Sequence, residues 1–202
     1  VLLAPYPFAD AERIVAVWQT NVKIPNATQP VSPGNFMDWK TRARSFELLA
    51  AAEPYSFDWV GPEGPEAFEI SFVTEDFFPL QGLRPLLGRT FVPAEFSPGK
   101  DNVVLLTESL WRTRFGGDSS IVGRTLILDT VPRVVVGVMP EDAMRPFDAK
   151  MWVPKRFQPE EMTTRTGDYW QVLGRLAPGV SLAQSQGEMD GVAAQLATEF
   201  PA

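Results

Sequence analysis

The stretch YWQVLGRLAPGVSLAQSQGEMDGVAAQLATEF, residues 169–200, contains the clearest strand and helix of the chain. YWQVLGRL is short and rich in aromatic and aliphatic residues, as a strand is, and the turn APG follows it. Ser181, with Gln184 three residues later, forms the capping box that begins a helix. The apolar residues of this helix recur at spacings of seven, three, four and four, which gives one stripe that we expect to pack on a sheet: Leu182, Met189, Val192, Leu196 and Phe200.

A second strand and helix lie in the middle of the chain. VVLL at 103–106 has the pattern of a buried strand, and TESLWRTRFGGD at 107–118 that of a helix. Thr107 is the expected N-cap and Gly116 the expected stop. RTLILD at 124–129 and RVVVGVM at 133–139 then predict two antiparallel strands.

The remaining predicted elements are strands and helices in no regular alternation. We expect strands at 13–19 and 151–154, and a long hairpin from 47–60 and 66–73. A helix should begin at Ser32 with Pro33 in its first turn, and its apolar face should comprise Phe36, Trp39, Ala43 and Phe46. EDFFPLQG at 75–82 predicts a short helix that Pro79 interrupts. This mixture indicates the α+β class.

One phrase, Gly-Arg-Thr, occurs twice between apolar residues, in LLGRTF at 86–91 and IVGRTL at 121–126. A phosphate-binding loop needs more glycines and a Lys at a helix start, which neither copy has. The copies are 35 residues apart, but no third copy supports a repeat protein. We therefore interpret both as turns in which Gly frees the backbone and Thr opens an extended segment. We expect neither Arg89 nor Arg124 to bind an anion.

Composition narrows the classes of function. The 202 residues are 45% hydrophobic and include neither His nor Cys, which excludes Ser-His-Asp and Cys-His catalysis and Cys/His zinc sites. The net charge of −7 opposes binding to a phosphate backbone, so we expect no nucleic-acid partner. The densest basic stretch holds only Lys40, Arg42 and Arg44.

Adjacent acids and tryptophans are the remaining candidates for a site. The pairs Glu75/Asp76, Glu141/Asp142 and Glu160/Glu161 lack the spacing of a calcium loop, and we interpret them as structural. Asn26 begins a common glycosylation sequon. Six tryptophans could line a groove, but each has a plausible core position: Trp18, Trp39, Trp59, Trp111, Trp152 and Trp170. We expect no catalytic, cofactor-binding or metal-binding residue, no cofactor and no enzyme activity, and the sequence identifies no residue for substrate or partner binding.

Seven phrases together, in order, resemble the MacB-like extracytoplasmic core domain of ABC transporter permeases over nearly the whole chain. They are PYPFADAERIVAVWQTN, VSPGNFMDWKTRARSFELLAA, EDFFPLQGLRPLLGRTF, LWRTRFGGDSSIVGRTLILD, VVGVMP, MWVP and GRLAPGVSLAQSQGEMD. The resemblance implies a porter-like subdomain with βαβ-type topology from residues 1–75 and 151–202, and an inserted, Sabre-like α+β subdomain from 76–150. Two local departures are Pro79 and the turn Asp129-Thr130, where Asp-Gly is usual.

In this family the domain lies between the first two membrane helices of the permease, on the periplasmic side of the inner membrane. The resemblance therefore implies that the chain, which begins at Val1 without Met, is part of a larger protein. It also implies a role in which ATP hydrolysis by a cytoplasmic subunit or domain is relayed, through flanking membrane helices, to substrates or partner proteins. Expected partners are that ATPase, a periplasmic adaptor or outer-membrane duct, and a second copy of the permease.

Two alternatives stay open. A free-standing envelope module could bind a carbohydrate or peptide, which requires two or more exposed tryptophans on a concave surface. A hydrolase using carboxylates alone requires two acids that face each other across a cleft, about 5 to 9.5 Å apart.

Overall fold

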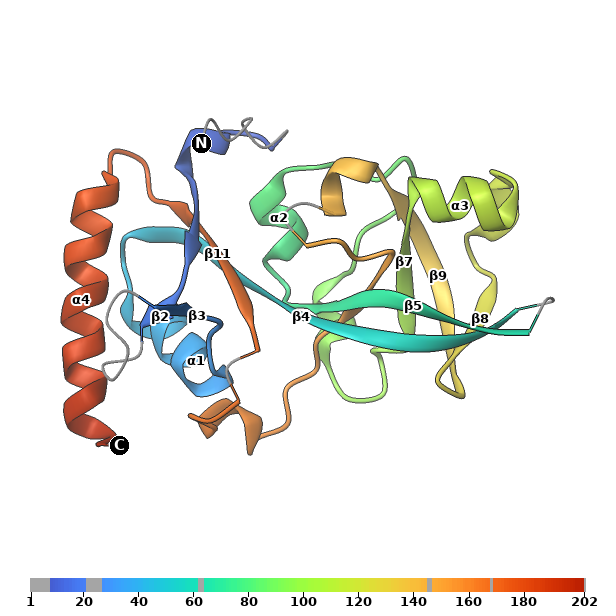
Figure 1. Ribbon diagram of the computed structural model, residues 1–202. Helices are drawn as coiled ribbons and strands as arrows, with labels where there is room; N and C mark the ends of the chain where they lie inside the picture. The colour runs from blue at the N-terminus through green and yellow to red at the C-terminus, as the bar shows by residue number, and fades with distance from the viewer. Residues whose placement is uncertain (1–7, 21–26, 62–63, 145–146, 168, 202) are drawn as a thin grey trace. The chain divides into compact units, whose positions relative to one another are not determined.

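A computed structural model describes residues 8–20, 27–61, 64–144, 147–167 and 169–201 of the chain (Figure 1). The chain divides into two compact units. Unit 1 comprises Val1–Ala11 and Ala52–Arg156, and unit 2 comprises Glu12–Ala51 and Phe157–Ala202. The mixed α+β class predicted from the sequence is confirmed, with four α-helices among the described residues.

Unit 1 is built on strands that pair in a closed ring. In order around the ring they are β4 (Phe46–Gly61, from Ala52 on), β5 (Gly64–Val73), β10 (Met151–Pro154), β7 (Val103–Thr107), β9 (Val131–Met139) and β8 (Thr125–Leu128). The β5–β10 and β7–β9 pairs are parallel and the others antiparallel. The ring closes where Trp59 of β4 pairs with Leu128 of β8 and the Asp129 N–H donates to the Asp58 carbonyl at 2.9 Å.

A cluster of buried hydrophobic side chains joins the strands of the ring to the helix that follows β7. Its members are Phe57, Phe68, Ile70, Val104, Leu106, Leu110, Ile121, Leu126, Leu128, Val135, Val138, Met151 and Val153. That helix, α3 (Glu108–Phe115), adds partly buried Trp111 and Phe115 to the cluster. As predicted, the Thr107 side chain accepts from the Leu110 N–H, and Gly116 ends the helix with φ of 64°.

The turn of the β8–β9 hairpin is unusual in sequence. Asp129 and Thr130 both have positive φ, 47° and 68°, as two-residue hairpin turns often require. The Asp129 carboxylate accepts from the Asp58 N–H at 2.7 Å. Asp129-Thr130 thus forms a turn with positive φ, although Asp-Gly is usual there. Thr130, a β-branched residue, lies in a region of φ that favours glycine.

Both GRT phrases lie along one edge of β9. Strand β7 occupies the other edge, because Val134 and Val138 pair with it as well as with β8 and β6 (Leu87–Gly88) respectively. Gly88 has φ of 69° and Gly123 of 92°, so both glycines adopt a backbone conformation that other residues rarely adopt. The predicted turn is confirmed at Gly123, whereas Gly88 lies in strand β6. Thr125 opens β8 as expected. Thr90 of the first copy does not open a strand as expected, because the strand β6 ends at Gly88 and the 3-10 helix η2 (Pro93–Phe96) follows the phrase.

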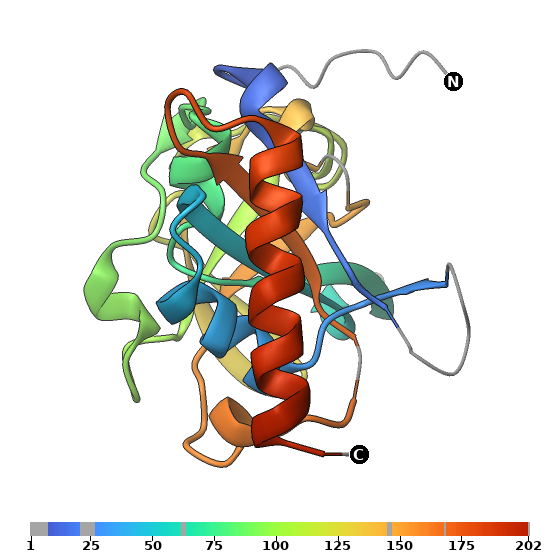
Figure 2. The ribbon, with the colours of Figure 1, turned by 90° about the vertical axis from the view of Figure 1, so that its left-hand side faces the viewer.

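Unit 2 is a small sheet covered by helices. β1 (Ile14–Val17) pairs antiparallel with β11 (Gln171–Leu176), which lies beside the beginning of β4. Helices α1 (Pro33–Arg42) and α4 (Leu182–Glu199) pack on these strands, and Figure 2 looks onto α4 in front of them. The buried core comprises Val17, Val31, Phe36, Trp39, Leu49, Ala51, Trp170, Val172, Val192 and Leu196. Smaller elements are β2 (Gln19–Thr20), β3 (Thr28–Gln29) and the 3-10 helix η5 (Glu161–Thr163).

Three local expectations about helices are wrong. α1 ends at Arg42, and Phe46 begins β4 instead of extending the helix. On α4, Val192 and Leu196 are buried, but Leu182 is 62% and Phe200 48% exposed, because they lie at the helix ends, beyond the strands that the middle covers. The predicted capping box of Ser181 and Gln184 is confirmed.

The third concerns α2 (Phe77–Gln81), which begins after the acids Glu75 and Asp76. Pro79 is therefore its third residue, where the missing N–H would have no intrahelical partner, so the proline does not interrupt the helix.

The compact units do not coincide with the predicted subdomain ranges 1–75 with 151–202 and 76–150. Residues 52–75 group with 76–156 because the β4–β5 hairpin pairs with β10 and β8. The subdomain ranges describe an expected correspondence with the family, and they stay a prediction.

Candidate functional site

The described residues contain no group of three or more acids that could hold a metal ion. Within the same residues, no helix combines the length and apolarity needed to cross a membrane.

Two acids from the adjacent pairs accept hydrogen bonds from backbone N–H groups. Glu141 accepts from the Ser109 N–H at 3.0 Å, near the beginning of α3, and Glu161 accepts from the Gln158 N–H at 2.9 Å. Asp76 takes the N-cap position of α2. These positions agree with the structural interpretation of the acids. The sequon residue Asn26 lies outside the described residues.

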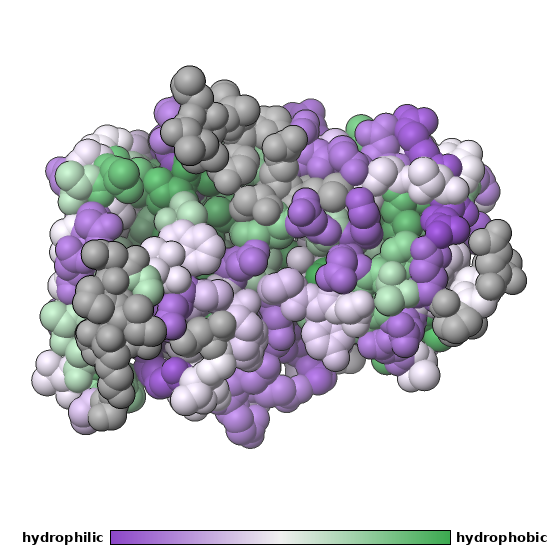
Figure 3. Space-filling view, in the orientation of Figure 1, coloured by the Kyte–Doolittle hydropathy of each residue, from purple (hydrophilic) through white to green (hydrophobic). Residues whose placement is uncertain are grey.

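Tryptophan burial bears on the alternative of a binding module. Trp39, Trp152 and Trp170 are buried, and Trp59 and Trp111 pack partly buried against the core of unit 1. Trp18 is 44% exposed, so its predicted core position is wrong. Hydrophobic residues reach the surface in Figure 3 between hydrophilic ones. The binding module required at least two exposed tryptophans, and one of the six is more than a third exposed.

The arginines of the two GRT phrases have partners within unit 1. Arg89 donates to both carboxylate oxygens of Glu95, at 2.9 and 2.6 Å. Burial opposes ionisation of Glu95, but the hydrogen bonds from Arg89 and the Val92 N–H outweigh it and lower the pKa of Glu95. The Arg124 guanidinium lies 5.9 Å from the centroid of the Phe115 ring. These contacts explain both arginines as structural residues.

Polar contacts in unit 2 attach α4 to the residues just before β4. Glu188 of α4 accepts hydrogen bonds from the N–H groups of Arg44 and Ser45, at 2.9 and 2.7 Å, and from the Ser45 hydroxyl. Burial alone would raise the pKa of Glu188, but these hydrogen bonds outweigh it and lower the pKa. A carboxylate with several N–H and O–H donors is a strong, directional link.

A second link joins the region before β1 to the same sheet. The Arg13 guanidinium donates to the Leu176 carbonyl at the end of β11, at 3.0 and 2.6 Å, and forms an ion pair with Glu47 of β4. The start of β4 thus receives two charged contacts, one from Arg13 on Glu47 and one from Glu188 on the two residues that precede the strand. We name these contacts, made by Arg13 and Glu188, the β4 anchors.

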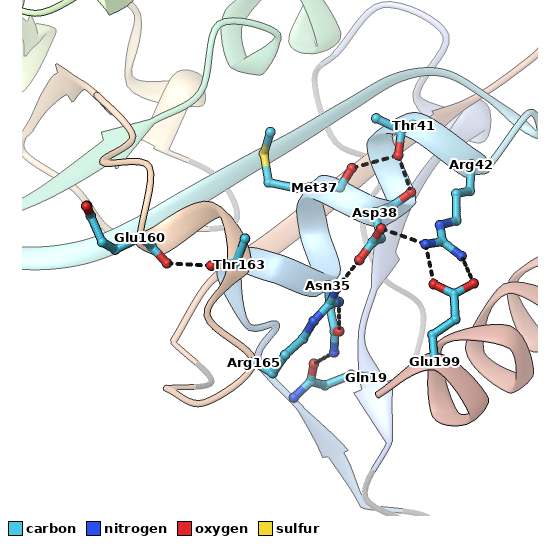
Figure 4. Close-up of polar contacts among 10 residues, drawn as sticks. All are labelled: Gln19, Asn35, Met37, Asp38, Thr41, Arg42, Glu160, Thr163, Arg165 and Glu199. Carbon is cyan, nitrogen blue, oxygen red and sulfur yellow. Dashed lines mark hydrogen bonds and ion pairs between the residues drawn. The ribbon is translucent and has the colours of Figure 1, made fainter. Parts of the chain in front are cut away.

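A further set of charged residues, the α1–α4 network, is defined by Asp38, Arg42, Arg165 and Glu199 (Figure 4). Arg42 donates to both oxygens of Glu199 at 2.7 Å, and its contact with Asp38 is 3.1 Å long. Asp38 also pairs with Arg165. The bond from Arg42 is the main cause that lowers the pKa of Glu199 and raises that of Arg42.

Arg165 connects the loop after η5 to both helices. It donates to Asn35 of α1 at 2.8 Å, and its guanidinium lies 3.8 Å from the centroid of the Phe200 ring. The Gly34 N–H donates to the Thr164 carbonyl at 2.8 Å, and a Cβ on Gly34 would lie 2.8 Å from that oxygen. Glycine therefore allows the close approach of the loop to α1.

Together these contacts link α1, α4, the loop after η5 and the start of β4. Two members of the basic stretch contribute to them, Arg42 through its side chain and Arg44 through its backbone N–H. Sequence reasoning missed Glu188 and Arg165. The partners of Glu188 lie 143 and 144 residues away and Asn35 lies 130 residues from Arg165, so no local pattern could have indicated them.

Comparison with known proteins finds a matching family model. The family model that matches is the MacB-like periplasmic core domain, over residues 3–192 of the chain. No curated protein matches.

Three solved structures share the fold at low sequence identity. A domain assigned to a permease protein from Porphyromonas gingivalis has a TM-score of 0.70 and 19% identity, covering 93% of this chain and 83% of that one. The periplasmic region of MacB from Actinobacillus actinomycetemcomitans has a TM-score of 0.65 and 14% identity, and the match covers 92% of this chain and 83% of that one. The extracellular domain of the noncanonic ABC-type transporter YknZ from Gram-positive bacteria has a TM-score of 0.63 and 17% identity, and the match covers 92% of this chain and 94% of that one.

Proposed function

The chain belongs to the MacB-like periplasmic core domain family of ABC transporter permeases, and from this premise we propose that it relays ATP-driven movement from the membrane to substrates or partner proteins outside it. In this proposal the chain is a periplasmic part of an inner-membrane permease and is not itself an enzyme. Its own residues transmit displacement, and the chemistry of ATP hydrolysis takes place in a cytoplasmic subunit or domain.

The observation that carries the proposal is the pair of β4 anchors. Arg13, before β1, contacts Glu47 of β4, and Glu188 of α4 contacts Ser45, the residue just before β4, so two segments that are distant in sequence are attached where β4 starts. β4 continues as one strand from Phe46 to Gly61 and carries residues of unit 1 from Ala52 on. A displacement applied to β1 or α4 would therefore act on the strand that covalently connects the two units.

The family suggests how the remaining parts are assigned. We take residues 1–75 with 151–202 as the porter-like subdomain and 76–150 as the Sabre-like insertion. The expected partners are the ATPase, reached through flanking membrane helices, a periplasmic adaptor or outer-membrane duct, and a second permease copy. Efflux of a drug or peptide, or handling of a lipoprotein, fits this assembly.

The test is to measure movement of the domain during ATP turnover. The chain contains no cysteine, so spin labels placed at Gln195→Cys in α4 and Thr113→Cys in α3 would be its only labels. The full-length permease, free of other accessible cysteines and assembled with its ATPase in nanodiscs, is examined by pulsed electron paramagnetic resonance without nucleotide, with ATP, and after vanadate trapping.

We expect the distance distribution between the labels to change with nucleotide state, and not to change with a hydrolysis-deficient ATPase after vanadate addition. The same distribution in every state of the active assembly would contradict the proposed relay. Labels placed within α4 alone, at Gln186→Cys and Gln195→Cys, provide the control for changes in label behaviour.

A further inference from the structure

The ring of unit 1 carries an unusual group of side chains at the end where β7 begins and β10 ends. Three aromatic rings, Tyr55 and Phe57 of β4 and Phe72 of β5, contact one another in edge-on geometry, with centroids 5.5 to 5.7 Å apart. Phe57 is buried, whereas Tyr55 is 50% exposed. Such edge-on groups leave a ring face available, and Tyr55 brings this face to the surface.

A buried arginine lies against these rings. The Arg133 guanidinium is 5.3 Å from the centroid of the Phe57 ring, and the residue is only 7% exposed. Its Nη1 donates to the Asp101 carbonyl at 2.9 Å, just before β7. Its Nε is buried without a hydrogen-bond partner, and no carboxylate of the described residues forms an ion pair with it.

This arginine differs from the second cation at the same end of the ring. Lys155 lies 5.8 Å from the Phe72 ring centroid and pairs with Glu53 at 2.8 Å, so its charge has a counterion. The carboxylates of Asp101 and Asp129 lie in the surroundings of Arg133, but among the described residues no carboxylate is bonded to it. Burial lowers its pKa, and the charges of Asp101 and Asp129 only partly oppose this effect. A buried N–H without an acceptor is costly and rare in folded proteins.

We propose that this end of the ring binds an aromatic carboxylate, whose ring packs on Tyr55 and whose carboxylate accepts a hydrogen bond from Arg133 Nε. Phe57 contacts both residues, so the Tyr55 ring and the Arg133 guanidinium flank the same side chain. A carboxylate carries a single charge and suits one guanidinium, whereas a phosphate would add a second charge close to Asp101 and Asp129. The ligand is either a small aromatic acid or the end of a peptide with a C-terminal aromatic residue. The proposed relay does not depend on this site.

The experiment compares an acid with its amide. Binding of 2-naphthoate and 2-naphthamide to the 202-residue chain is measured by nuclear magnetic resonance titration. We expect the acid to bind at least about tenfold more tightly, because a charge-assisted hydrogen bond contributes about that factor. The tripeptide Ala-Ala-Phe, as free acid and as amide, tests the peptide source in the same way.

Variants assign the effect to residues. Arg133→Met should reduce the affinity for naphthoate to that for the amide, and Tyr55→Ala should weaken both ligands. Arg124→Met is the matched control, because Arg124 also lies over a phenylalanine ring, 5.9 Å from Phe115, but is exposed. It should change neither affinity.

Equal binding of acid and amide by the unmodified chain, for both ligand pairs, would overturn the proposal, as would no binding of either acid. Unchanged naphthoate binding in a folded Arg133→Met variant would also overturn it. If that variant does not fold, the comparison of acid with amide on the unmodified chain still decides.

Discussion

Unit 1 closes its strands into a ring around buried hydrophobic side chains and adds surface ion pairs such as Arg114–Glu66. Unit 2 attaches its two helices to its strands with a network of charged contacts in addition to a hydrophobic core, and its described strands form no ring. Hydrophobic packing inside a ring depends little on salt or pH and has few alternative arrangements. Ion pairs and hydrogen bonds near the surface are weaker and depend on both. The comparison teaches that unit 1 is suited to keep its shape, and unit 2 to be the adjustable part.

The largest expected effect is a cavity in the ring. Leu128 of β8 is fully buried at the closing pair with Trp59, so Leu128→Ala should lower the free energy of unfolding by about 3 to 4 kcal/mol. Leu196→Ala on α4, 7% exposed and beside the end of its helix, should cost about 2 kcal/mol. Urea unfolding monitored by fluorescence measures both. A larger loss for Leu196→Ala would reverse the comparison.

The next effect distinguishes the two GRT glycines. A Cβ on Gly88 would lie 2.3 Å from the Val136 carbonyl oxygen of β9, whereas nothing lies within 4 Å of a Cβ on Gly123. Both have positive φ. We expect Gly88→Ala to cost about 2 kcal/mol or more, from strain and displacement of β9, and Gly123→Ala about 1 kcal/mol from backbone strain alone. Equal losses in thermal unfolding would show that the contact with β9 does not matter.

A smaller effect tests the charged attachment in unit 2. Glu188→Gln should cost about 1 kcal/mol at pH 7, because it removes the charge that strengthens three hydrogen bonds. The pKa of Glu188 is lower in the folded chain than its ordinary value. Its contribution to stability is therefore present above the unfolded pKa of about 4.3 and is lost as pH falls through the folded pKa.

The matched control for this change is Asp190→Asn, which alters an acid on the same helix that accepts only from Gln186 among its described contacts. The free energy of unfolding is measured from pH 7 down to pH 3 for the unmodified chain and for Glu188→Gln. The two values should approach each other as the pH falls, whereas a difference caused by packing would stay the same. A constant difference over this range would contradict the role of the charge.

The smallest effect is a gain. Thr130 adopts φ of 68° in the β8–β9 turn, a conformation that is strained for a β-branched residue and free for glycine. Thr130→Gly should raise the free energy of unfolding by about 0.5 to 1 kcal/mol. Differential scanning calorimetry measures this gain, and a loss of stability would show that the Thr130 side chain contributes more than its strain costs.

Local patterns predicted most of the elements, and the resemblance of seven ordered phrases predicted the family. The capping box at Ser181, the cap at Thr107 and the stop at Gly116 were readable because each depends on residues within one or two turns. The end of α1 was not readable, because spacing alone places Phe46 on its apolar face, whereas pairing in the sheet draws Phe46 into β4.

Contacts between distant parts of the chain were not predictable. The ring closes through Trp59 and Leu128, and no sequence pattern relates these two strands. Glu188 reads as one polar residue on the exposed face of a helix, until the fold places it over the N–H groups of Arg44 and Ser45. Burial of Arg133 was likewise not predictable. Its strand begins with alternating exposed and buried residues, and an arginine in such a strand is expected on the exposed face.

The central claim is that displacement reaches β4 through its charged anchors, and the most direct test is to weaken one anchor in the working permease. Glu188→Gln and the control Asp190→Asn are introduced into the full-length permease with spin labels at Gln195→Cys and Thr113→Cys, and the label distances are measured during ATP turnover. We predict that Asp190→Asn keeps the nucleotide-dependent change in distance and that Glu188→Gln reduces it while ATP hydrolysis continues. An undiminished change in Glu188→Gln would contradict the account.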